Sequence, residues 1–272
     1  MLIAQISDLH FRADGTLLHH GIDPQAALAN CVAHVERLDP RPDLILATGD
    51  LADRGQVEDY PPLRDMLGRI GLPVYVIPGN HDDRDAMRAI FGPAGYLPAS
   101  GPFLHYTVED YPLRLIGLDT LLPGKIVGGL CEARLSWLAE RLAEQPERPT
   151  LIFMHHPPFP SGIVFLDQPA FQGAEELARI ISVNHQVRQI VCGHIHRAMH
   201  LSWAGTSAAV APSSIYQMNL AFSPGSTFDP TDDPAAISLY RWQDGVGPVG
   251  YISLIGKSPA YAAGVVAAAL PA

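Results

Sequence analysis

An apolar segment ends at a glycine and a carboxylate in the stretch Asp43-Leu44-Ile45-Leu46-Ala47-Thr48-Gly49-Asp50. A short apolar run that stops at turn residues is typical of a strand buried on both faces of a sheet. The same pattern recurs on either side of this stretch, because residues 2–6 and 74–77 are also apolar and also run into polar loops. The sequence therefore predicts strands at residues 2–6, 43–48 and 74–77.

Helical patterns fill the two intervals between these strands. Asp23-Pro24 is typical of an N-cap followed by proline at the first helical position, and apolar residues then recur at helical spacing up to Leu38. Residues 58–70 carry a second helical pattern. An alternation of strands and helices predicts a parallel sheet with helices packed against it, so we assign the chain to the α/β class.

The second half of the chain continues this alternation, and we expect more antiparallel character there. Residues 103–108 and 113–118 predict two neighbouring antiparallel strands, and residues 132–142 carry leucines along one helical stripe. Residues 211–234 are rich in proline, serine and aspartate and predict a long loop. No change in composition marks a second domain, so we expect one domain over residues 1–272. Further strands are predicted at residues 151–154, 187–192, 206–210, 237–242 and 249–254.

Composition restricts the class of function. The chain has 272 residues, of which 47% are hydrophobic and 17% charged, as in ordinary globular proteins. Its formal net charge of −10 argues against long nucleic acids as partners, because binding them normally requires a basic surface. Three widely separated cysteines form no metal-binding pair, and neither a signal peptide nor an apolar run of membrane-spanning length is evident. We therefore expect a cytoplasmic protein that does not enter a membrane and that acts on a small molecule.

Side chains that can bind metals follow the predicted strands at the points where the strands end. They are Asp8, His10, Asp50, Asn80, His81, His155, His156, His194 and His196. In open α/β sheets, ligands bind outside the carboxyl ends of the strands. We therefore expect these side chains to converge on one edge of the fold.

The spacing of the candidates suits coordination. Asp8 and His10 lie two residues apart, so on an extended backbone both side chains would project to one face, and His194 and His196 have the same spacing. A glycine allows a sharp turn or a close approach of the backbone. Glycine precedes a candidate ligand at three places, namely Gly49, Gly79 and Gly193.

Charge favours two metal ions over one. Carboxylate, amide and imidazole groups together suit first-row ions such as Fe, Mn, Co and Zn. Two divalent ions bring four positive charges, whereas Asp8 and Asp50 return two negative ones, and the surplus would bind a phosphodiester anion and acidify a bridging water. Asp50 has two oxygens and could bridge ions about 3.5–4 Å apart, and Asn80 adds an oxygen ligand without adding charge.

Five ordered motifs resemble those of the calcineurin-like metallophosphoesterase superfamily. The motifs are Asp8-x-His10, Gly49-Asp50, Gly79-Asn80-His81-Asp82, His155-His156-Pro157-Pro158 and Gly193-His194-x-His196. Within the superfamily, the chain is most similar to bacterial class III cyclic-nucleotide phosphodiesterases and the related glycerophosphodiesterases. The resemblance implies a four-layer α/β/β/α sandwich, in which helices flank two central sheets.

The resemblance also implies the roles of the site residues. Asp50 would lie between two metal ions, and His81 would stay off the metals and face the substrate. We expect a binuclear-metal phosphodiesterase for small phosphodiesters, in which a metal-bound hydroxide attacks phosphorus in line and His81 assists the leaving group. One metal would be held by Asp8, His10 and His196, and the other by Asn80, His155 and His194.

Two other functions use the same fold. A phosphomonoesterase or phosphoprotein phosphatase would use the same two-metal core, and a non-catalytic scaffold would use the sheet edge to bind protein partners. Glycerophosphodiesterases have a histidine after the last active-site strand, where this chain has Tyr216, so cyclic nucleotides and glycerophosphodiesters both stay open as substrates. The resemblance further implies a homo-oligomer, and the alanine-rich segment 261–272 is either a dimer contact or a frayed end.

Three neighbours of the candidate ligands have roles that the sequence leaves open. Adjacent strand residues point in opposite directions, so His156 is more typical of a supporting residue than of a ligand. Asp82 either caps the following helix or orients His81. Arg12 either contacts the substrate phosphate or is a solvated residue near a turn.

Overall fold

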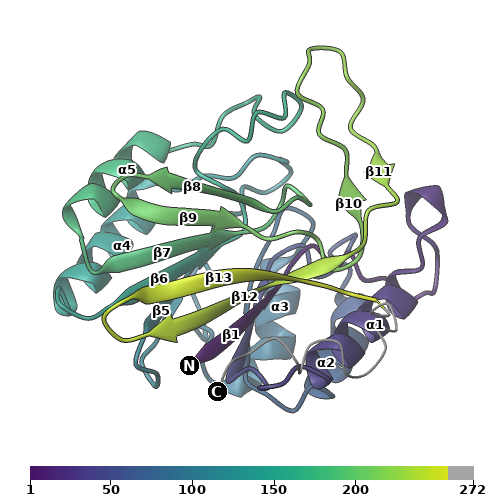
Figure 1. The fold of residues 1–272 in the computed structure, drawn as a ribbon, viewed down its shortest axis with the longest axis horizontal. Helices are drawn as coiled ribbons and strands as arrows, with labels where there is room; N and C mark the ends of the chain where they lie inside the picture. Colours follow the sequence, from purple (N-terminus) through teal and green to yellow (C-terminus); the bar gives the residue numbers. More distant parts are fainter. Residues whose placement is uncertain (257–272) are drawn as a thin grey trace, which may run out of the picture.

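Two β-sheets form the centre of the computed structural model, which describes residues 1–256 (Figure 1). The segment 261–272, predicted to be a dimer contact or a frayed end, lies outside the described residues. The organisation of residues 1–272 as one domain therefore stays a prediction.

The first sheet has the strand order β13-β12-β1-β2-β3. Its strands are β1 (Leu2–Ile6), β2 (Leu44–Thr48), β3 (Val74–Ile77), β12 (Ala236–Gln243) and β13 (Gly247–Leu254). Strands β1, β2 and β3 are parallel, as predicted, and β12 pairs with β1 in the antiparallel orientation. The parallel orientation follows from the connecting helices, which return the chain to the same edge before the next strand begins.

The second sheet has the strand order β4-β5-β6-β7-β9-β8. The predicted antiparallel pair β4–β5 is confirmed, but β5, β6, β7 and β9 are parallel. Within this sheet the antiparallel pairs are at the two edges, because helices connect the interior strands β5, β6 and β7. The expected antiparallel character of the second half of the chain is also present in the first sheet, where β12 and β13 pair in the antiparallel orientation. The strands are β4 (Tyr106–Val108), β5 (Arg114–Leu118), β6 (Thr150–Met154), β7 (Val187–Cys192), β8 (Met199–Trp203) and β9 (Thr206–Val210).

Helices flank the two sheets (Figure 1). Helices α1 (Pro24–Glu36), α2 (Tyr60–Gly68) and α3 (Arg84–Phe91) belong to the first sheet, and α4 (Glu132–Glu144) and α5 (Ala174–Val183) to the second. The predicted N-cap is confirmed, because the Asp23 carboxylate accepts hydrogen bonds from the backbone N–H groups of Gln25 and Ala26. The sequence indicated a helix after Asp82 without giving its bounds, which corresponds to α3, and it did not predict α5. Short 3-10 turns occur at His19–Gly21, Val57–Asp59 and Gly92–Ala94.

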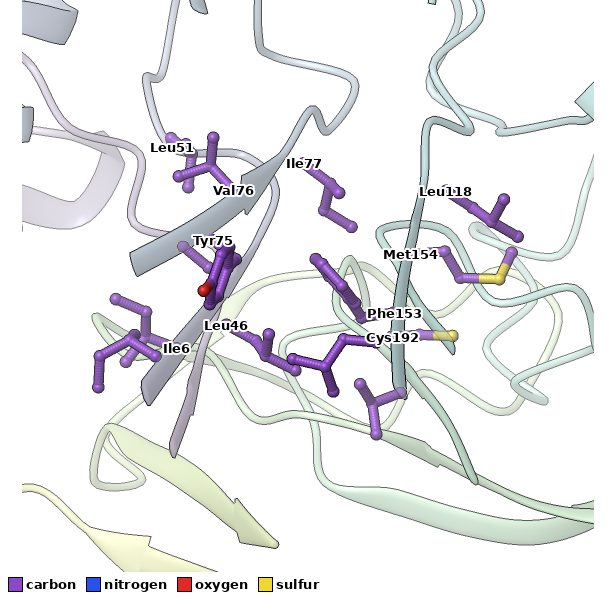
Figure 2. Close-up of a cluster of buried hydrophobic side chains, with 14 of the residues drawn as sticks. Ile6, Leu46, Leu51, Tyr75, Val76, Ile77, Leu118, Phe153, Met154 and Cys192 are labelled. Carbon is purple, nitrogen blue, oxygen red and sulfur yellow. The ribbon is translucent and has the colours of Figure 1, made fainter. Parts of the chain in front are cut away.

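Apolar side chains from both sheets fill the space between them. Figure 2 shows Ile6 and Leu46 of the first sheet together with Phe153 and Cys192 of the second, and all four are fully buried. Burying such a side chain stabilises the fold by about 1.5–3 kcal/mol. A buried hydrogen bond also crosses between the sheets, since Gln5 Nε2 donates to the carbonyl oxygen of Cys192 at 2.8 Å. The packing brings the carboxyl ends of β1 and β7 next to each other.

The predicted long loop contains a two-stranded arm. Strands β10 (Gln217–Met218) and β11 (Pro230–Thr231) pair in the antiparallel orientation and project from the body of the protein (Figure 1). Among residues 1–256, no helix is both long enough and apolar enough to span a bilayer.

Candidate metal centre

The predicted site residues follow strands of both sheets. Asp8 and His10 follow β1, Asp50 follows β2, and Asn80 and His81 follow β3. The remaining candidates follow strands of the second sheet, with His155 after β6 and His194 and His196 after β7. The site therefore lies where the carboxyl ends of the two sheets meet, as the strand-end pattern predicted.

Backbone hydrogen bonds hold the loops of the site together. The N–H of Asp8 donates to the carbonyl of Gly49 at 3.1 Å, and the N–H of His10 donates to the carbonyl of Asp50 at 2.9 Å. The N–H of His194 donates to the Asp8 carboxylate at 3.0 Å, which joins a loop of the second sheet to a loop of the first. Strand ends that are far apart in the sequence are thus fixed side by side.

The backbone of the site is strained. The expectation of an extended backbone at Asp8 and His10 was wrong, because both residues adopt the left-handed conformation. Non-glycine residues in this conformation cost about 1–3 kcal/mol each and cluster at functional sites. The values of φ are 56° at Asp8, 42° at His10, 49° at Asp50, 74° at His194 and 53° at His196.

Glycine allows the loops to approach closely, as predicted. A Cβ atom at Gly49, whose φ is +90°, would lie 2.5 Å from Nδ1 of His155. A Cβ atom at Gly79 would overlap the Asp50 side chain, and one at Gly193 would overlap the hydroxyl of Ser7. Two of these glycines therefore leave room for the side chains of predicted ligands.

A first cluster of possible metal ligands contains Asp8, His10 and His196. All three residues are buried, and their ligand atoms lie within 4.8 Å of one another. The Nε2 atoms of His10 and His196 are 3.2 Å apart, and Nε2 of His196 lies 3.5 Å from Oδ1 of Asp8. These are the three residues assigned to one metal from the sequence, and the structure brings them together.

A second cluster contains His155, His156 and His194, again with ligand atoms within 4.8 Å of one another. His194 thus lies with His155, whereas His196 lies with Asp8 and His10. The expectation that the side chains of His194 and His196 project to one face was wrong, because the left-handed backbone at both residues turns them into different clusters.

Asp50 lies between the two clusters. Its Oδ2 atom is 3.4 Å from Nε2 of His155 and 3.8 Å from Nε2 of His10. Its Oδ1 atom accepts a hydrogen bond from the backbone N–H of His81 at 2.9 Å. Burial acts to raise the pKa of Asp50, but the imidazoles of His155, His81 and His10 together outweigh burial and hold the pKa well below its usual range.

Hydrogen bonds fix which imidazole nitrogens are available to a metal. Nδ1 of His155 lies 2.7 Å from the carbonyl oxygen of Thr48, and Nδ1 of His196 lies 3.3 Å from that of Tyr216. A carbonyl oxygen can only accept, so in the neutral imidazole Nδ1 carries the proton and Nε2 keeps its lone pair. Both Nε2 atoms face the acidic groups of the site, which is the orientation that a metal ligand requires.

Buried polar atoms without partners also fit a metal site. Among the described residues, Nε2 of His155 and Oδ1 of Asn80 are buried and form no hydrogen bond. Leaving such an atom unpaired costs about 1–3 kcal/mol. Asn80 lies between Gly79 and His81, which both contact Asp50. Coordination to a metal would satisfy both atoms, so the residues present fit the predicted ions.

Burial and neighbouring charges shift the pKa values of the imidazoles in opposite directions. Burial, assisted by the positive charge of His155, lowers the pKa of His194 to about 3. Burial acts to lower the pKa of His155 as well, but the carboxylate of Asp50 outweighs it and raises the pKa to about 9. Metal binding at His155 would therefore displace a proton.

His81 differs from the predicted ligands because its side chain is 40% exposed. Its Nδ1 atom lies 2.7 Å from the carbonyl oxygen of Asp53, so Nδ1 carries a proton and Nε2 is the other available nitrogen. Its ring packs edge to face on His10, with centroids 4.7 Å apart. This placement agrees with a group that faces the substrate.

The sequence analysis missed Asp53. Oδ1 of this residue lies 3.2 Å from Nδ1 of His10, and Oδ2 lies 2.7 Å from the Arg12 guanidinium. Burial acts to raise the pKa of Asp53, but its partners His10 and Arg12 outweigh burial and lower the pKa to about 2. The Arg12 guanidinium is therefore paired and largely buried rather than solvated, and its contact with a substrate phosphate stays a prediction. Nothing in the local sequence marks Asp53, because its partners come from another loop.

Two other neighbours also depart from the sequence-based alternatives. Asp82 does not cap the following helix, because the N-cap of α3 is Asp83. Its carboxylate accepts hydrogen bonds from backbone N–H groups such as that of Leu51 and forms none with His81. Nδ1 of His156 lies 2.8 Å from the hydroxyl of Thr120, in agreement with a supporting residue, although its ring also adjoins the second cluster. The ring of Tyr216 packs against His196, with centroids 4.6 Å apart, so Tyr216 forms part of the wall of the first cluster.

Several known proteins are similar to this chain in sequence or in fold. A probable glycerophosphodiester phosphodiesterase (GpdQ) of Arcobacter nitrofigilis is 35% identical to this chain over 94% of both sequences. The 3',5'-cyclic adenosine monophosphate phosphodiesterase CpdA of Escherichia coli is 34% identical, covering 79% of this chain and 76% of its own length. A solved dimetal phosphatase of Danio rerio has the same fold, with a TM-score of 0.64 at 13% identity, over 94% of this chain and 99% of that chain.

The family match extends through all five motifs. Residues 1–198 match the family described as calcineurin-like phosphoesterase, and this range includes every residue predicted to bind a metal. The α/β class and the sandwich of two sheets flanked by helices are thereby confirmed. The chain belongs to the calcineurin-like phosphoesterase family.

Proposed function

We propose that this chain is a two-metal phosphodiesterase that hydrolyses small phosphodiesters. The observation that carries the proposal is the position of Asp50, whose Oδ2 atom lies within 4 Å of an imidazole nitrogen of each cluster. A carboxylate in this position can contribute one oxygen to each of two ions. The relatives named glycerophosphodiester and cyclic-nucleotide phosphodiesterases support a diester as the substrate.

The ligands of the two ions follow from the clusters. When bound, the ions would supply positive charge for the phosphoryl oxygens and would activate a water molecule. Mixed imidazole, carboxylate and amide groups favour Fe, Mn, Co or Zn. One ion is assigned to Asp8, His10 and His196, the other to Asn80, His155 and His194, and Asp50 lies between them.

His81 is the group of this site that is free to act on the substrate. In its protonated form, Nε2 can donate to a phosphate oxygen or to the leaving alkoxide, while Nδ1 stays bonded to the carbonyl of Asp53. The 40% exposure of the side chain leaves it accessible to a substrate. His81 is therefore the proposed general acid, and Asp53 holds its ring in place.

Two alternatives to a phosphodiesterase, a phosphomonoesterase and a non-catalytic scaffold, have less support. Both cyclic nucleotides and glycerophosphodiesters are consistent with the names of the relatives. The likeness to a dimetal phosphatase concerns the fold alone, so it does not favour a phosphomonoesterase. A non-catalytic scaffold would not require buried ligand atoms such as Oδ1 of Asn80, whose burial without a partner disfavours that alternative.

Hydrolysis by protein of defined metal content tests the proposal. Metal-stripped protein is reloaded separately with Mn, Co, Zn and Fe, and turnover of bis(4-nitrophenyl) phosphate is compared with that of 4-nitrophenyl phosphate. We expect metal-dependent turnover that favours the diester. Preference for the monoester would assign the protein to the phosphatases, and folded protein without turnover under any metal would favour the scaffold.

Metal identity, assembly and location complete the proposal. We infer a homo-oligomer in the cytoplasm on the basis of the resemblance and the composition. The reloading series identifies the most active metal, and the metal content of protein purified from its own cells identifies the native one. Light scattering of the full chain measures the oligomeric state.

A further inference from the structure

A cavity of about 240 Å³ adjoins the second cluster. The loop that follows β6 forms most of its wall. His156 and His194 form the side nearest the metal centre, so the cavity adjoins the proposed reaction site. The principal apolar residues of its wall are Val127, Phe159, Leu166 and Phe171.

The wall of this cavity is suited to an uncharged group. No lysine or arginine is among its lining residues, all of which belong to the described part of the chain. Its one carboxylate, Asp167, is engaged, because it accepts hydrogen bonds from the backbone N–H and hydroxyl of Ser161 and from the N–H of Gly162, at 2.7–2.8 Å. A second phosphate or another anion would therefore find no counter-charge here.

The size of the cavity matches an aromatic ring. An apolar cavity of about 150 Å³ in another protein holds a benzene molecule. The cavity beside His194 is larger, at about 240 Å³, and so has room for one ring with its substituents. A glycerol group would leave most of the apolar wall without contacts.

Tertiary contacts hold the wall of the cavity in place. The N–H of Val164 donates to the carbonyl of Ala221, and the ring of Phe165 stacks on Phe228 with centroids 5.7 Å apart. These contacts attach the loop after β6 to the connection between β10 and β11. The side chain of Phe159 is buried. The cavity therefore does not depend on a free loop.

We propose that this cavity binds an aromatic group on the ester that the substrate retains after cleavage. The inference rests on the proposed function and names its substrate class, a phosphodiester that carries an aryl or nucleobase group. Side-chain atoms of His81, His10 and Asp53 lie within 4.8 Å of one another, on the side of the first cluster. The cavity instead adjoins His194, which belongs to the second cluster. We place the leaving group beside His81 and the retained ester beside His194, toward the cavity.

Two diesters with the same leaving group test the proposal. Phenyl 4-nitrophenyl phosphate and methyl 4-nitrophenyl phosphate differ only in the retained ester, and both release 4-nitrophenolate. For the metal-loaded full chain we expect kcat/KM to be about tenfold or more higher for the phenyl ester, because the ring is buried in the cavity. Equal values for two active substrates would overturn the cavity assignment and leave the phosphodiesterase intact.

Variants that fill the cavity provide a second test, and the same substitution outside the cavity is their control. Ala174→Phe places a ring in the cavity from the first residue of α5, and Ala170→Phe does so from an exposed loop position. Ala133→Phe makes the same change at an exposed position of α4 that does not line the cavity. We expect either cavity variant to lose the preference for the phenyl ester, with methyl ester hydrolysis within about twofold of wild type.

Three results would contradict this expectation. Retention of the phenyl preference in both cavity variants would place the ring elsewhere. A loss of the preference in Ala133→Phe as well would show that the effect does not come from the cavity. Failure of the wild-type chain to hydrolyse either diester with any metal would overturn the proposed function and this inference with it.

Discussion

The carboxylate of Asp82 accepts a hydrogen bond from the backbone N–H of Leu51 at 3.1 Å. The same carboxylate accepts from the N–H groups of Ala52 and Gly79 and from the hydroxyl of Tyr60. Asp82 is buried and therefore ties the loop after β3 to the loop after β2, which carries Asp50. Asp82 thus positions Asp50, the carboxylate that lies between the two clusters.

Replacement of Asp82 should destabilise the fold and weaken metal binding together. Asp82→Ala leaves three buried N–H groups without an acceptor, so we expect a loss of about 3 kcal/mol or more in the free energy of unfolding. Denaturant titration measures this loss, and titration with Mn measures metal affinity. The control Asp83→Ala removes an N-cap, with an expected cost of about 1 kcal/mol and no change in affinity. Equal effects of the two variants would contradict the assigned role of Asp82.

Replacement of Asp50 should abolish both metal occupancy and turnover. Asp50→Ala removes the carboxylate between the two clusters, so neither ion keeps its full set of ligands. Metal content measured by mass spectrometry should fall together with the rate of diester hydrolysis. Asp65→Ala, which removes an exposed carboxylate paired with Arg64, should leave both unchanged. Fully metal-loaded and active Asp50→Ala protein would refute the assignment.

Replacement of His81 should separate catalysis from metal binding. His81→Ala removes the proposed general acid, and general acid catalysis typically contributes at least about a hundredfold to the rate. We expect a decrease of that size in kcat with unchanged metal content. The loss should be smaller for a diester with a good leaving group such as 4-nitrophenolate than for one with an alkyl alcohol, because a good leaving group needs less protonation. Loss of a metal ion from this variant would instead make His81 a ligand.

The close approach at Gly193 predicts a strong effect of one added methyl group. In Gly193→Ala the added Cβ atom would clash with the hydroxyl of Ser7, the residue next to Asp8, so one of them must move. We therefore expect a loss of about 1–3 kcal/mol in the free energy of unfolding and weaker metal binding. Gly68→Ala is the matched control, because a Cβ atom there meets open space at the end of α2. That substitution should stabilise the protein by about 0.5–1 kcal/mol. Equal thermal stability of the two variants would count against the packing argument.

The lowered pKa of Asp53 predicts a pH dependence of stability. A carboxylate whose pKa falls to about 2 on folding stabilises the native state above its unfolded pKa, and this contribution is lost as the pH falls through the folded value. We compare the free energy of unfolding of the wild-type chain and of Asp53→Asn, both without metal. After allowance for screening by solvent, we expect the wild-type value to be higher by about 1 kcal/mol at pH 6. The difference should become progressively smaller below about pH 4. A difference independent of pH would show that the charge of Asp53 does not stabilise the fold.

Local sequence determined most of the strands, although not β8, β10 or β11, and the identity of the candidate ligands. An apolar run such as that in residues 43–48 is removed from water on both faces only in an interior strand of a sheet. All residues of β2 are indeed buried. The motif Gly49-Asp50 places a carboxylate at the end of that strand, and the side chains after β1, β3, β6 and β7 converge with it at one edge. These features were predictable because each depends on residues that are adjacent in the chain.

Tertiary structure decided the details that depend on contacts between loops. Whether His194 and His196 share a face follows from a left-handed backbone, which is held by hydrogen bonds such as that from His194 to Asp8. The roles of Asp53 and Asp82 follow from partners that other loops provide, at Arg12 and Leu51. The cavity beside His194 likewise needs the loop after β6 to pack on a distant segment. Sequence pattern specifies which groups lie at the ends of the strands, but the distances and angles between those groups arise from long-range packing.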